Sequence, residues 1–161
     1  MDAKSEAKRT TIEKKSDREI VVRRTFDAPA RIVFEAWSKP ELFKRWWVPK
    51  SMGMTLVSCE QDVRTGGRYH LEFGQGMAFF GRYIEVTPHS RIVWTNEESG
   101  EDGSVTTVTF DERDGKTLLK LSDLYPSKEA LERAGGAEGG LSESFDQLEA
   151  LLTATHLTST R

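Results

Sequence analysis

The most reactive residue types in this sequence are three histidines, a single cysteine and a few polar groups on predicted strands. His70, His89 and His156 fall on a strand, a turn and a helix end, and no H-x-x-x-H or H-E-x-x-H spacing directs two imidazoles to one metal ion. No G-x-S-x-G motif presents a serine nucleophile, and no G-x-G-x-x-G motif follows a strand to bind phosphate. We therefore expect no metal site and no cofactor.

Cys59 lies on a predicted strand beside an acidic residue, with no helix N-terminus or cation nearby to lower the thiol pKa. It is expected to be a small buried side chain rather than a nucleophile. His70, Arg82 and Glu85 remain as groups that could orient a ligand or act as acid and base. Alternation along a strand puts Arg82 and Glu85 on opposite faces, which weakens a joint catalytic role.

The elements that position these groups begin with a strand over residues 19–26, rich in β-branched side chains. Pro29 suits a first helical turn, and apolar residues then recur at helical spacing up to Trp37. A second short amphipathic helix over residues 42–47 ends at Pro49. We expect the two helices to form a V.

From Met52 to Leu124 the apolar pattern has a period of two residues, and turn signals divide it into six strands. Asp114-Gly115, between two alternating segments, is a strong hairpin signal. Gly81 in the middle of a strand costs stability, so it is expected to mark a bend or a close approach of the backbone. The pattern predicts an antiparallel meander.

The last predicted helix begins near Leu141 and carries an apolar stripe. The stripe consists of Leu141, Phe145, Leu148, Leu152 and His156, and the residues expected to face water are Glu143, Asp146, Gln147 and Glu149. The stripe requires another apolar surface, so the helix is expected to pack on the sheet.

The composition fits one soluble globular domain: 161 residues, 37% hydrophobic and 30% charged. A net charge of -3 disfavours a nucleic-acid partner. No apolar run approaches the roughly 20 residues of a membrane helix, and the first residues lack a signal-peptide centre. With one cysteine, these features favour a cytoplasmic protein. Residues 1–18 are expected to form a flexible N-terminal tail, and residues 19–157 a single domain.

The order of the elements predicts an α+β fold of the helix-grip type. A curved antiparallel sheet of about seven strands would wrap on the long C-terminal helix, with two short helices after the first strand. A curved sheet facing a helix tends to leave a pocket. Trp46 and Trp47 are adjacent and cannot both face one core, so either both anchor the V of helices or one closes the pocket.

Several segments resemble the SRPBCC (START-like) superfamily, and within it the heat-shock-protein-90 ATPase activator homologue family of C-terminal-domain type. They are Phe26-Asp27-Ala28-Pro29, Val33-Phe34-Glu35-Ala36-Trp37, Trp46-Trp47-Val48-Pro49, Asp62-x-Arg64-x-Gly66-Gly67-x-Tyr69, Gly81-x-Tyr83-x-Glu85-Val86, Arg91-Ile92-Val93-Trp94, and Gly140-Leu141-x-x-Ser144-Phe145-Asp146-x-Leu148. The resemblance spans about residues 19–152. Leu141 departs from the family, which often carries Trp after this glycine.

The architecture and the resemblance together imply a domain that binds a small hydrophobic or amphipathic molecule in a cavity. The alternatives are a co-chaperone-like interaction module that stimulates a chaperone ATPase, and a cyclase- or hydrolase-like enzyme that uses the same cavity. The predicted cavity residues are Trp46, Tyr69, His70, Leu71, Phe79, Phe80, Arg82, Tyr83, Trp94, Phe145 and Leu148.

Overall fold

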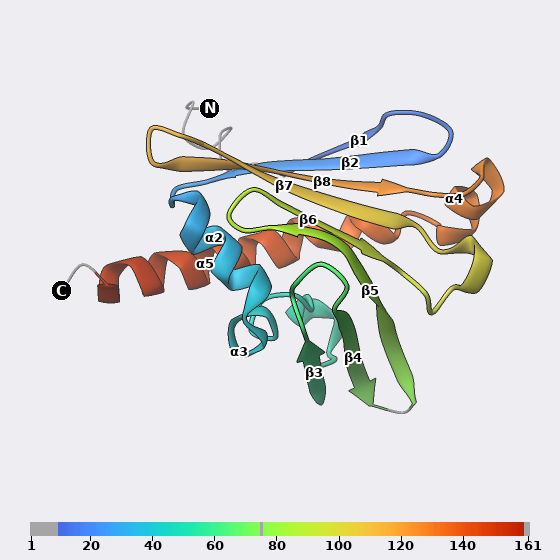
Figure 1. Ribbon diagram of the computed structural model, residues 1–161, viewed down its shortest axis with the longest axis horizontal. Helices are drawn as coiled ribbons and strands as arrows, with labels where there is room; N and C mark the ends of the chain where they lie inside the picture. The colour runs from blue at the N-terminus through green and yellow to red at the C-terminus, as the bar shows by residue number, and fades with distance from the viewer. Residues whose placement is uncertain (1–9, 75, 160–161) are drawn as a thin grey trace.

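Eight antiparallel strands form one curved sheet, and a long C-terminal helix packs against it (Figure 1). The computed structural model describes residues 10–74 and 76–159. The strands are β1 (Thr11–Lys14), β2 (Glu19–Phe26), β3 (Ser58–Gln61), β4 (Arg68–Gly74), β5 (Met77–Thr87), β6 (Arg91–Thr95), β7 (Val105–Arg113) and β8 (Lys116–Leu124). The helices are α2 (Ala30–Ser38), α3 (Pro40–Phe43), α4 (Lys128–Ala134) and α5 (Leu141–Ser159), with 3-10 turns η1 (Lys50–Met52), η2 (Gly100–Asp102) and η3 (Ala137–Gly140).

The strand order is β1-β2-β8-β7-β6-β5-β4-β3. Strands β3 to β8 therefore form a meander, and the N-terminal strands β2 and β1 extend the sheet beyond β8. This arrangement confirms the predicted α+β helix-grip fold. The described residues contain one strand more than the seven expected, because β1 precedes the first predicted strand. None of the described helices is long and apolar enough to cross a membrane.

Strand β1 corrects the prediction of a flexible tail up to Arg18. Thr11–Lys14 pairs antiparallel with β2, and Arg23 Nη1 donates to Glu13 Oε1 at 2.8 Å. All four β1 residues are exposed, so the strand depends on main-chain hydrogen bonds to a sheet edge rather than on buried side chains. The prediction of a flexible tail was based on amino-acid composition, which indicates only how much apolar surface a segment can bury. It could therefore not indicate a strand whose side chains are all exposed. Residues 1–9 lie outside the described residues.

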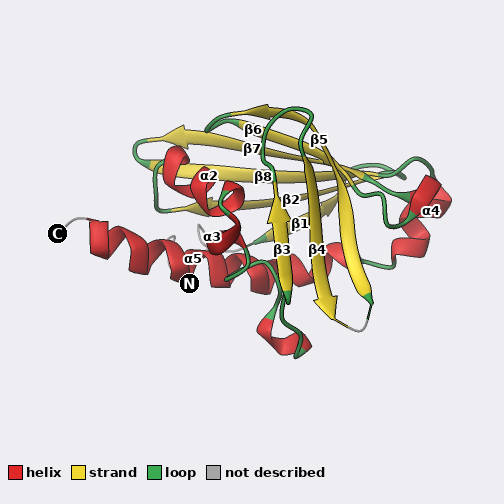
Figure 2. Ribbon diagram, turned by 60° about the horizontal axis from the view of Figure 1, so that its bottom comes forward, coloured by secondary structure: helices red, strands yellow, loops and turns green. Residues whose placement is uncertain are grey.

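The sheet turns at strand β5, which pairs with β4 along its first half and with β6 along its second. Gly81 lies at this corner, where a Cβ atom would come within 2.0 Å of the Thr95 carbonyl oxygen. The register also shifts between Tyr83 and Glu85. Gly81 is therefore a close backbone approach, as predicted, and β3, β4 and the first half of β5 turn away from the rest of the sheet (Figure 2).

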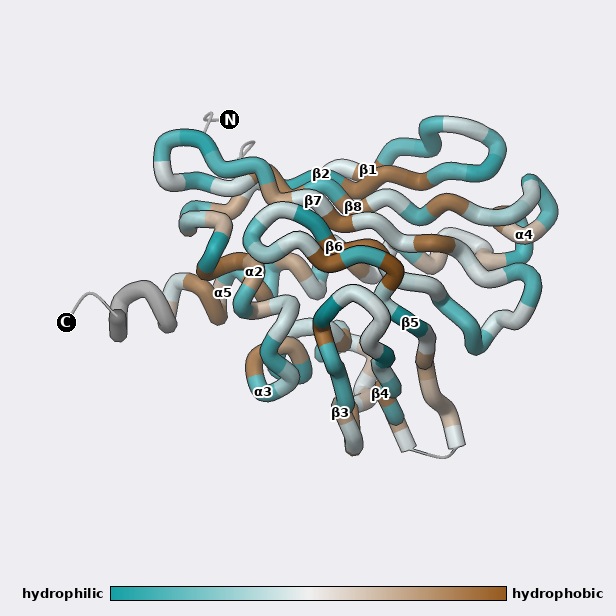
Figure 3. The backbone as a smooth tube through the Cα atoms, in the orientation of Figure 1, coloured by the Kyte–Doolittle hydropathy of each residue, from teal (hydrophilic) through white to brown (hydrophobic). Residues whose placement is uncertain are grey.

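The core lies between the sheet and helices α2, α3 and α5, and the apolar segments of the strands are brown in Figure 3. Phe145 and Leu148 on α5 are fully buried, and Phe145 meets Phe26 of β2 edge to face with ring centroids 5.8 Å apart. Trp46 is also fully buried, 4.8 Å from the Trp37 ring, and its Nε1 donates to the Ala36 carbonyl at 2.9 Å. Phe145, Leu148 and Leu152 of the apolar stripe are thus part of the core, and Leu141 packs against it, whereas the His156 side chain lies outside what the structure describes.

The polar face of α5 was predicted to face water, but all four of its residues also bind other segments of the chain, and only Asp146 among them is exposed. Gln147 Nε2 donates to the carbonyl oxygens of Trp46 and Val48, both at 2.9 Å. Glu143 accepts hydrogen bonds from the backbone and hydroxyl of Ser51, and these bonds lower its pKa. Helical periodicity identifies which side of α5 is apolar, but it does not predict that other segments of the chain form hydrogen bonds with the polar side.

Asp146 and Glu149, the other two, bind Arg24 of β2. Arg24 Nη1 donates to Asp146 Oδ1 at 2.5 Å and Nη2 donates to Glu149 Oε1 at 3.0 Å. Arg24 is only 4% exposed, so a guanidinium is buried between the sheet and α5. The two carboxylates neutralise this charge and thereby join α5 to β2.

Candidate functional site

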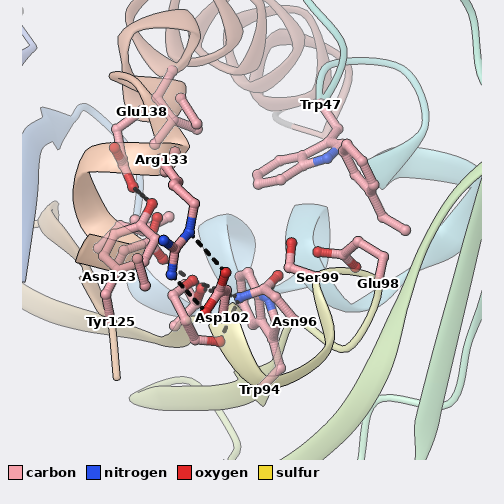
Figure 4. Close-up of a pocket in the computed structure, with 18 residues that line it drawn as sticks. Trp47, Trp94, Asn96, Glu98, Ser99, Asp102, Asp123, Tyr125, Arg133 and Glu138 are labelled. Carbon is pink, nitrogen blue, oxygen red and sulfur yellow. Dashed lines mark hydrogen bonds and ion pairs between the residues drawn. The ribbon is translucent and has the colours of Figure 1, made fainter. Parts of the chain in front are cut away.

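A pocket of about 430 Å³, which we call the main pocket, lies at the end of the sheet nearest α4 (Figure 4). Its walls come from the concave side of β5 to β8, the segment between β6 and β7, helix α4, η3 and the start of α5. The lining residues are Trp47, Phe79, Trp94, Asn96, Glu98, Ser99, Asp102, Ser104, Thr106, Leu121, Asp123, Tyr125, Ala130, Arg133, Ala134, Ala137, Glu138 and Leu141.

The wall formed by α4 and η3 is positioned by two local signals. Ser127 caps α4, and its side chain accepts a hydrogen bond from the Ala130 backbone N–H at 3.0 Å. Gly135 ends the helix in the left-handed conformation, at φ 60°, which glycine adopts without steric cost. The chain then enters η3, where Glu138 is buried beside the pocket.

One wall of the pocket is aromatic, with Trp47, Phe79 and Trp94. Trp47 lies outside the helices, but its carbonyl oxygen accepts the Ser144 hydroxyl of α5 at 2.6 Å. The Gln147 bonds to the neighbouring carbonyls hold the same segment. The aromatic wall is therefore fastened to α5.

A smaller pocket of about 40 Å³ continues behind this aromatic wall. It shares Trp47, Phe79 and Trp94 with the main pocket and is also lined by Trp37. The indole N–H of Trp37 is buried and has no hydrogen-bond partner among the described residues. A space of this size can hold one or more small polar groups, since a water molecule needs roughly 10–15 Å³.

Next to Trp94, the polar part of the lining is organised around Asn96. Asn96 Nδ2 donates to Ser104 Oγ at 3.0 Å and to Thr106 Oγ1 at 2.9 Å, and its Oδ1 accepts from Trp94 Nε1 at 3.3 Å. Thr106 in turn donates its hydroxyl to Asp123 Oδ1 at 2.5 Å. These bonds fix the side chains that separate the aromatic wall from the acidic end.

At the acidic end, the carboxyl group of Glu138 lies beside that of Asp123. Burial and the neighbouring Glu138 carboxyl raise the pKa of Asp123 well above its usual range. The Tyr125 hydroxyl donates to Glu138 Oε2 at 2.5 Å, and burial together with this bond raises the tyrosine pKa. Figure 4 shows Trp47 across the pocket from Tyr125 and Glu138.

Two further acidic residues lie around the pocket. Asp102 accepts two hydrogen bonds from Arg133, at 2.9 and 3.1 Å. Glu98 accepts the Phe80 backbone N–H at 3.0 Å, and burial raises its pKa. Arg133, the only basic residue in the lining, is thus already paired with a carboxylate.

The predicted cavity residues fall into three groups. Those that line the two pockets are Tyr69, Leu71, Phe79, Tyr83 and Trp94. Those that are buried in the core without lining either pocket are Trp46, Phe145 and Leu148. His70, Phe80 and Arg82 lie on the outer face of the sheet instead, because they alternate with the buried residues Tyr69, Leu71, Gly81 and Tyr83.

The outer-face residues do not join a catalytic set. The His70 ring stacks on Phe80, with centroids 6.2 Å apart. Arg82 Nε donates to Glu97 at 2.7 Å, whereas Glu85 accepts from Arg91 at 3.3 Å. The structure therefore does not bring His70, Arg82 and Glu85 together at a pocket.

The predicted cavity set did not include Asp123, Tyr125 and Glu138, and of the two adjacent tryptophans it included Trp46 rather than Trp47, which lines the pocket. Asp123 had a signal, because it continues the inward alternation of Leu119 and Leu121 on β8, where a carboxyl group is out of place. Glu138 had none, because it stands among glycines and turns inward only after the left-handed end of α4.

Cys59 and the possible metal ligands give no second site. Burial raises the pKa of the Cys59 thiol to about 11, in keeping with a small buried side chain. Within residues 10–74 and 76–159, no three His, Cys, Asp or Glu side chains are grouped so that they could hold a metal ion.

The curved sheet, the long C-terminal helix and the pocket between them define a helix-grip domain of the SRPBCC type. A family model described as "Activator of Hsp90 ATPase homolog 1-like protein" matches residues 27–153, and the chain belongs to this family. A search of curated proteins gives no match.

Solved structures agree with this assignment. A protein of Rhodobacter sphaeroides is similar at 21% identity with a TM-score of 0.77, over 90% of this chain and 98% of that one. Protein Ms6760 of Mycobacterium smegmatis is 25% identical with a TM-score of 0.75, over 91% and 99%. A Staphylococcus epidermidis protein is 28% identical with a TM-score of 0.72, over 90% and 94%.

Proposed function

We propose that the helix-grip domain, over residues 19–157, binds a small amphipathic molecule in the pocket beside α4. The observation that carries the proposal is a preformed space of about 430 Å³ that is lined by three large aromatic side chains and several polar ones. Ligand sites have this combination of apolar lining and a few convergent polar groups. The single cysteine is compatible with the reducing cytoplasm, where we propose that the protein works.

Two details support the proposal that this pocket is a ligand-binding site rather than a solvent-filled surface depression. Trp47 is held at the aromatic wall by hydrogen bonds from α5, so the wall exists before a ligand arrives. The indole N–H of Trp37, which lines the inner pocket, has no partner among the described residues. A buried donor of this kind is costly unless another group satisfies it.

Titration with N-phenyl-1-naphthylamine, an uncharged apolar fluorescent probe, tests the proposal. We expect the probe to become brighter on binding to the wild-type protein. Trp47→Ala removes part of the aromatic wall, and Ala134→Trp fills the pocket, so both are expected to weaken binding by about tenfold, or about 1.4 kcal/mol. Two variants that change the same space in opposite ways guard against a general loss of folding.

Phe80→Ala is the matched control, because Phe80 is a large apolar residue exposed on the outer face of the sheet. It is expected to leave probe binding unchanged. If Phe80→Ala abolishes binding, or if neither pocket variant has an effect, the probe binds elsewhere and the proposal is wrong.

A second candidate is a co-chaperone-like interaction module. Phe80 and Ile84 are 40% and 49% exposed on the outer face of β5, and the family description names an activator of a chaperone ATPase. Exposed apolar side chains on a rigid strand suit a protein contact. Stimulation of a heat-shock-protein-90 ATPase that is lost in Phe80→Ala but kept in Ala134→Trp would favour this candidate.

A further inference from the structure

The charges around the main pocket are strongly one-sided. Four of its lining residues are acidic and one is basic; the acidic ones are Glu98, Asp102, Asp123 and Glu138. The basic one, Arg133, makes two hydrogen bonds to Asp102, which neutralises that carboxylate. The remaining acidic groups therefore face the pocket without a cation from its own walls.

The Asp123–Glu138 pair is the most deeply placed of these groups, and Glu138 is 5% exposed. The hydroxyl donors on the pair are Thr106 to Asp123 and Tyr125 to Glu138. Among the described residues, no lysine or arginine bonds to either carboxyl group. Negative charge on this pair therefore faces the pocket without a cationic partner among the described residues.

A buried carboxylate without a cation is unfavourable, and a cationic ligand would relieve that cost. An anionic ligand would instead add repulsion at this end, because the only basic residue of the lining is engaged. Trp47 lies across the pocket from Glu138, and with Phe79 and Trp94 it gives an aromatic lining that suits an apolar or aromatic body. The acidic groups and the aromatic lining together describe a molecule with a positive end and an apolar end.

Building on the proposed function, we propose that the ligand of this pocket is a cationic amphiphile, with a protonated amine beside Asp123 and Glu138 and an apolar body against Trp47. The inference excludes fatty acids as preferred ligands. It assigns the carboxyl groups of Asp123 and Glu138 together as the site that recognises the amine.

Three ligands with one ten-carbon tail separate the head group from the tail: decylamine, decanol and decanoate. Each is titrated at pH 7 against the protein loaded with N-phenyl-1-naphthylamine, and displacement of the probe is followed by fluorescence. We expect decylamine to displace the probe at a concentration at least about tenfold lower than decanol or decanoate, because one well-placed charge pair is worth that much.

Variants then assign the preference to the carboxyl pair. The double variant Asp123→Asn with Glu138→Gln keeps the shape and the hydrogen-bonding atoms but removes the charge, so decylamine should lose its advantage over decanol. Asp123→Asn alone keeps the Glu138 carboxyl group and should keep the preference. Glu60→Gln changes the net charge equally on an exposed strand residue outside the main pocket, and should change nothing.

The outcomes separate the two proposals. If the probe binds and decanol or decanoate displaces it as well as decylamine does, the head-group inference is wrong and the pocket stands. If the amine preference survives in the double variant, or disappears in Glu60→Gln, it arises from the general charge of the protein and the inference is again wrong. If neither the probe nor any ten-carbon ligand binds, the proposed function itself is wrong, and the inference about the head group is wrong with it.

Discussion

The buried guanidinium of Arg24 provides the sharpest test of how α5 is attached to the sheet. Its side chain is 3% exposed and binds two carboxylates of unequal exposure, Asp146 at 67% and Glu149 at 28%. Arg24 Nη1 also donates to Thr10 Oγ1 at 3.0 Å, whereas its Nε has no partner among the described residues. The perturbation is removal of the carboxylates, singly and together.

The expected magnitudes follow from the exposures. Asp146→Ala removes a largely solvated partner and should lower the free energy of unfolding by about 1 kcal/mol or less. Glu149→Ala should cost about 1–2 kcal/mol, because its hydrogen bond to Arg24 is better shielded. Removing both leaves a buried charge without a counter-ion, which costs roughly 3–5 kcal/mol. The double variant should therefore exceed the sum of the single ones by about 1 kcal/mol or more.

Urea denaturation of the four proteins in this cycle measures these differences. Adding Arg24→Met to the double variant removes the stranded charge and should recover at least about 2 kcal/mol, since an apolar side chain suits a buried position. Strict additivity in the cycle, or no recovery with methionine, would refute the claim that Arg24 is a buried charge held by α5.

Three further predictions concern the core, the corner and the acidic pair. Phe145→Ala and Leu148→Ala should each lower the free energy of unfolding by roughly 2–5 kcal/mol in urea denaturation, because both residues are fully buried; losses below about 1 kcal/mol would contradict their placement. Gly81→Ala should cost about 1–3 kcal/mol because its Cβ would meet the Thr95 carbonyl, whereas Gly139→Ala, with open space around it, should be nearly neutral; equal effects would count against the corner. Since the pKa of Asp123 is raised in the folded state, the unfolded chain loses this proton first as the pH rises, so ionisation destabilises the fold above about pH 4, the usual range of an aspartate. The stability of Asp123→Asn relative to the wild type should therefore improve from pH 4 to pH 7, and a constant difference would argue against the raised pKa.

Most of the fold could be predicted from local patterns. The period-two segments and the Asp114-Gly115 turn correspond to observed strands, and the stripe of α5 lies in the core. These features depend on which side of an element is apolar, and hydrophobic spacing reports that directly. Strand β1 was not predicted, because its residues are all exposed and show no apolar side.

The site was less predictable, because it depends on contacts between distant segments. Spacing could not decide which of Trp46 and Trp47 enters the core, since the Trp46 indole is fixed by a carbonyl on α2 and the Trp47 backbone by Ser144 on α5. The predicted set of cavity residues combined inward-facing and outward-facing residues of both β4 and β5. His70, Phe80 and Arg82 were included because aromatic and polar residues alternate on these strands without a clear apolar face.

The corner at Gly81 separates the shape of the cavity from its chemistry. The bend is a contact between main-chain atoms of β5 and β6, whereas the acidic groups are side chains on β8 and on the segments after β6 and α4. Replacing those side chains leaves the bend untouched. The shape of the cavity and its selectivity can therefore change separately. Selectivity for a new head group can be engineered, or can evolve, at the acidic residues while the backbone bend that shapes the cavity stays the same.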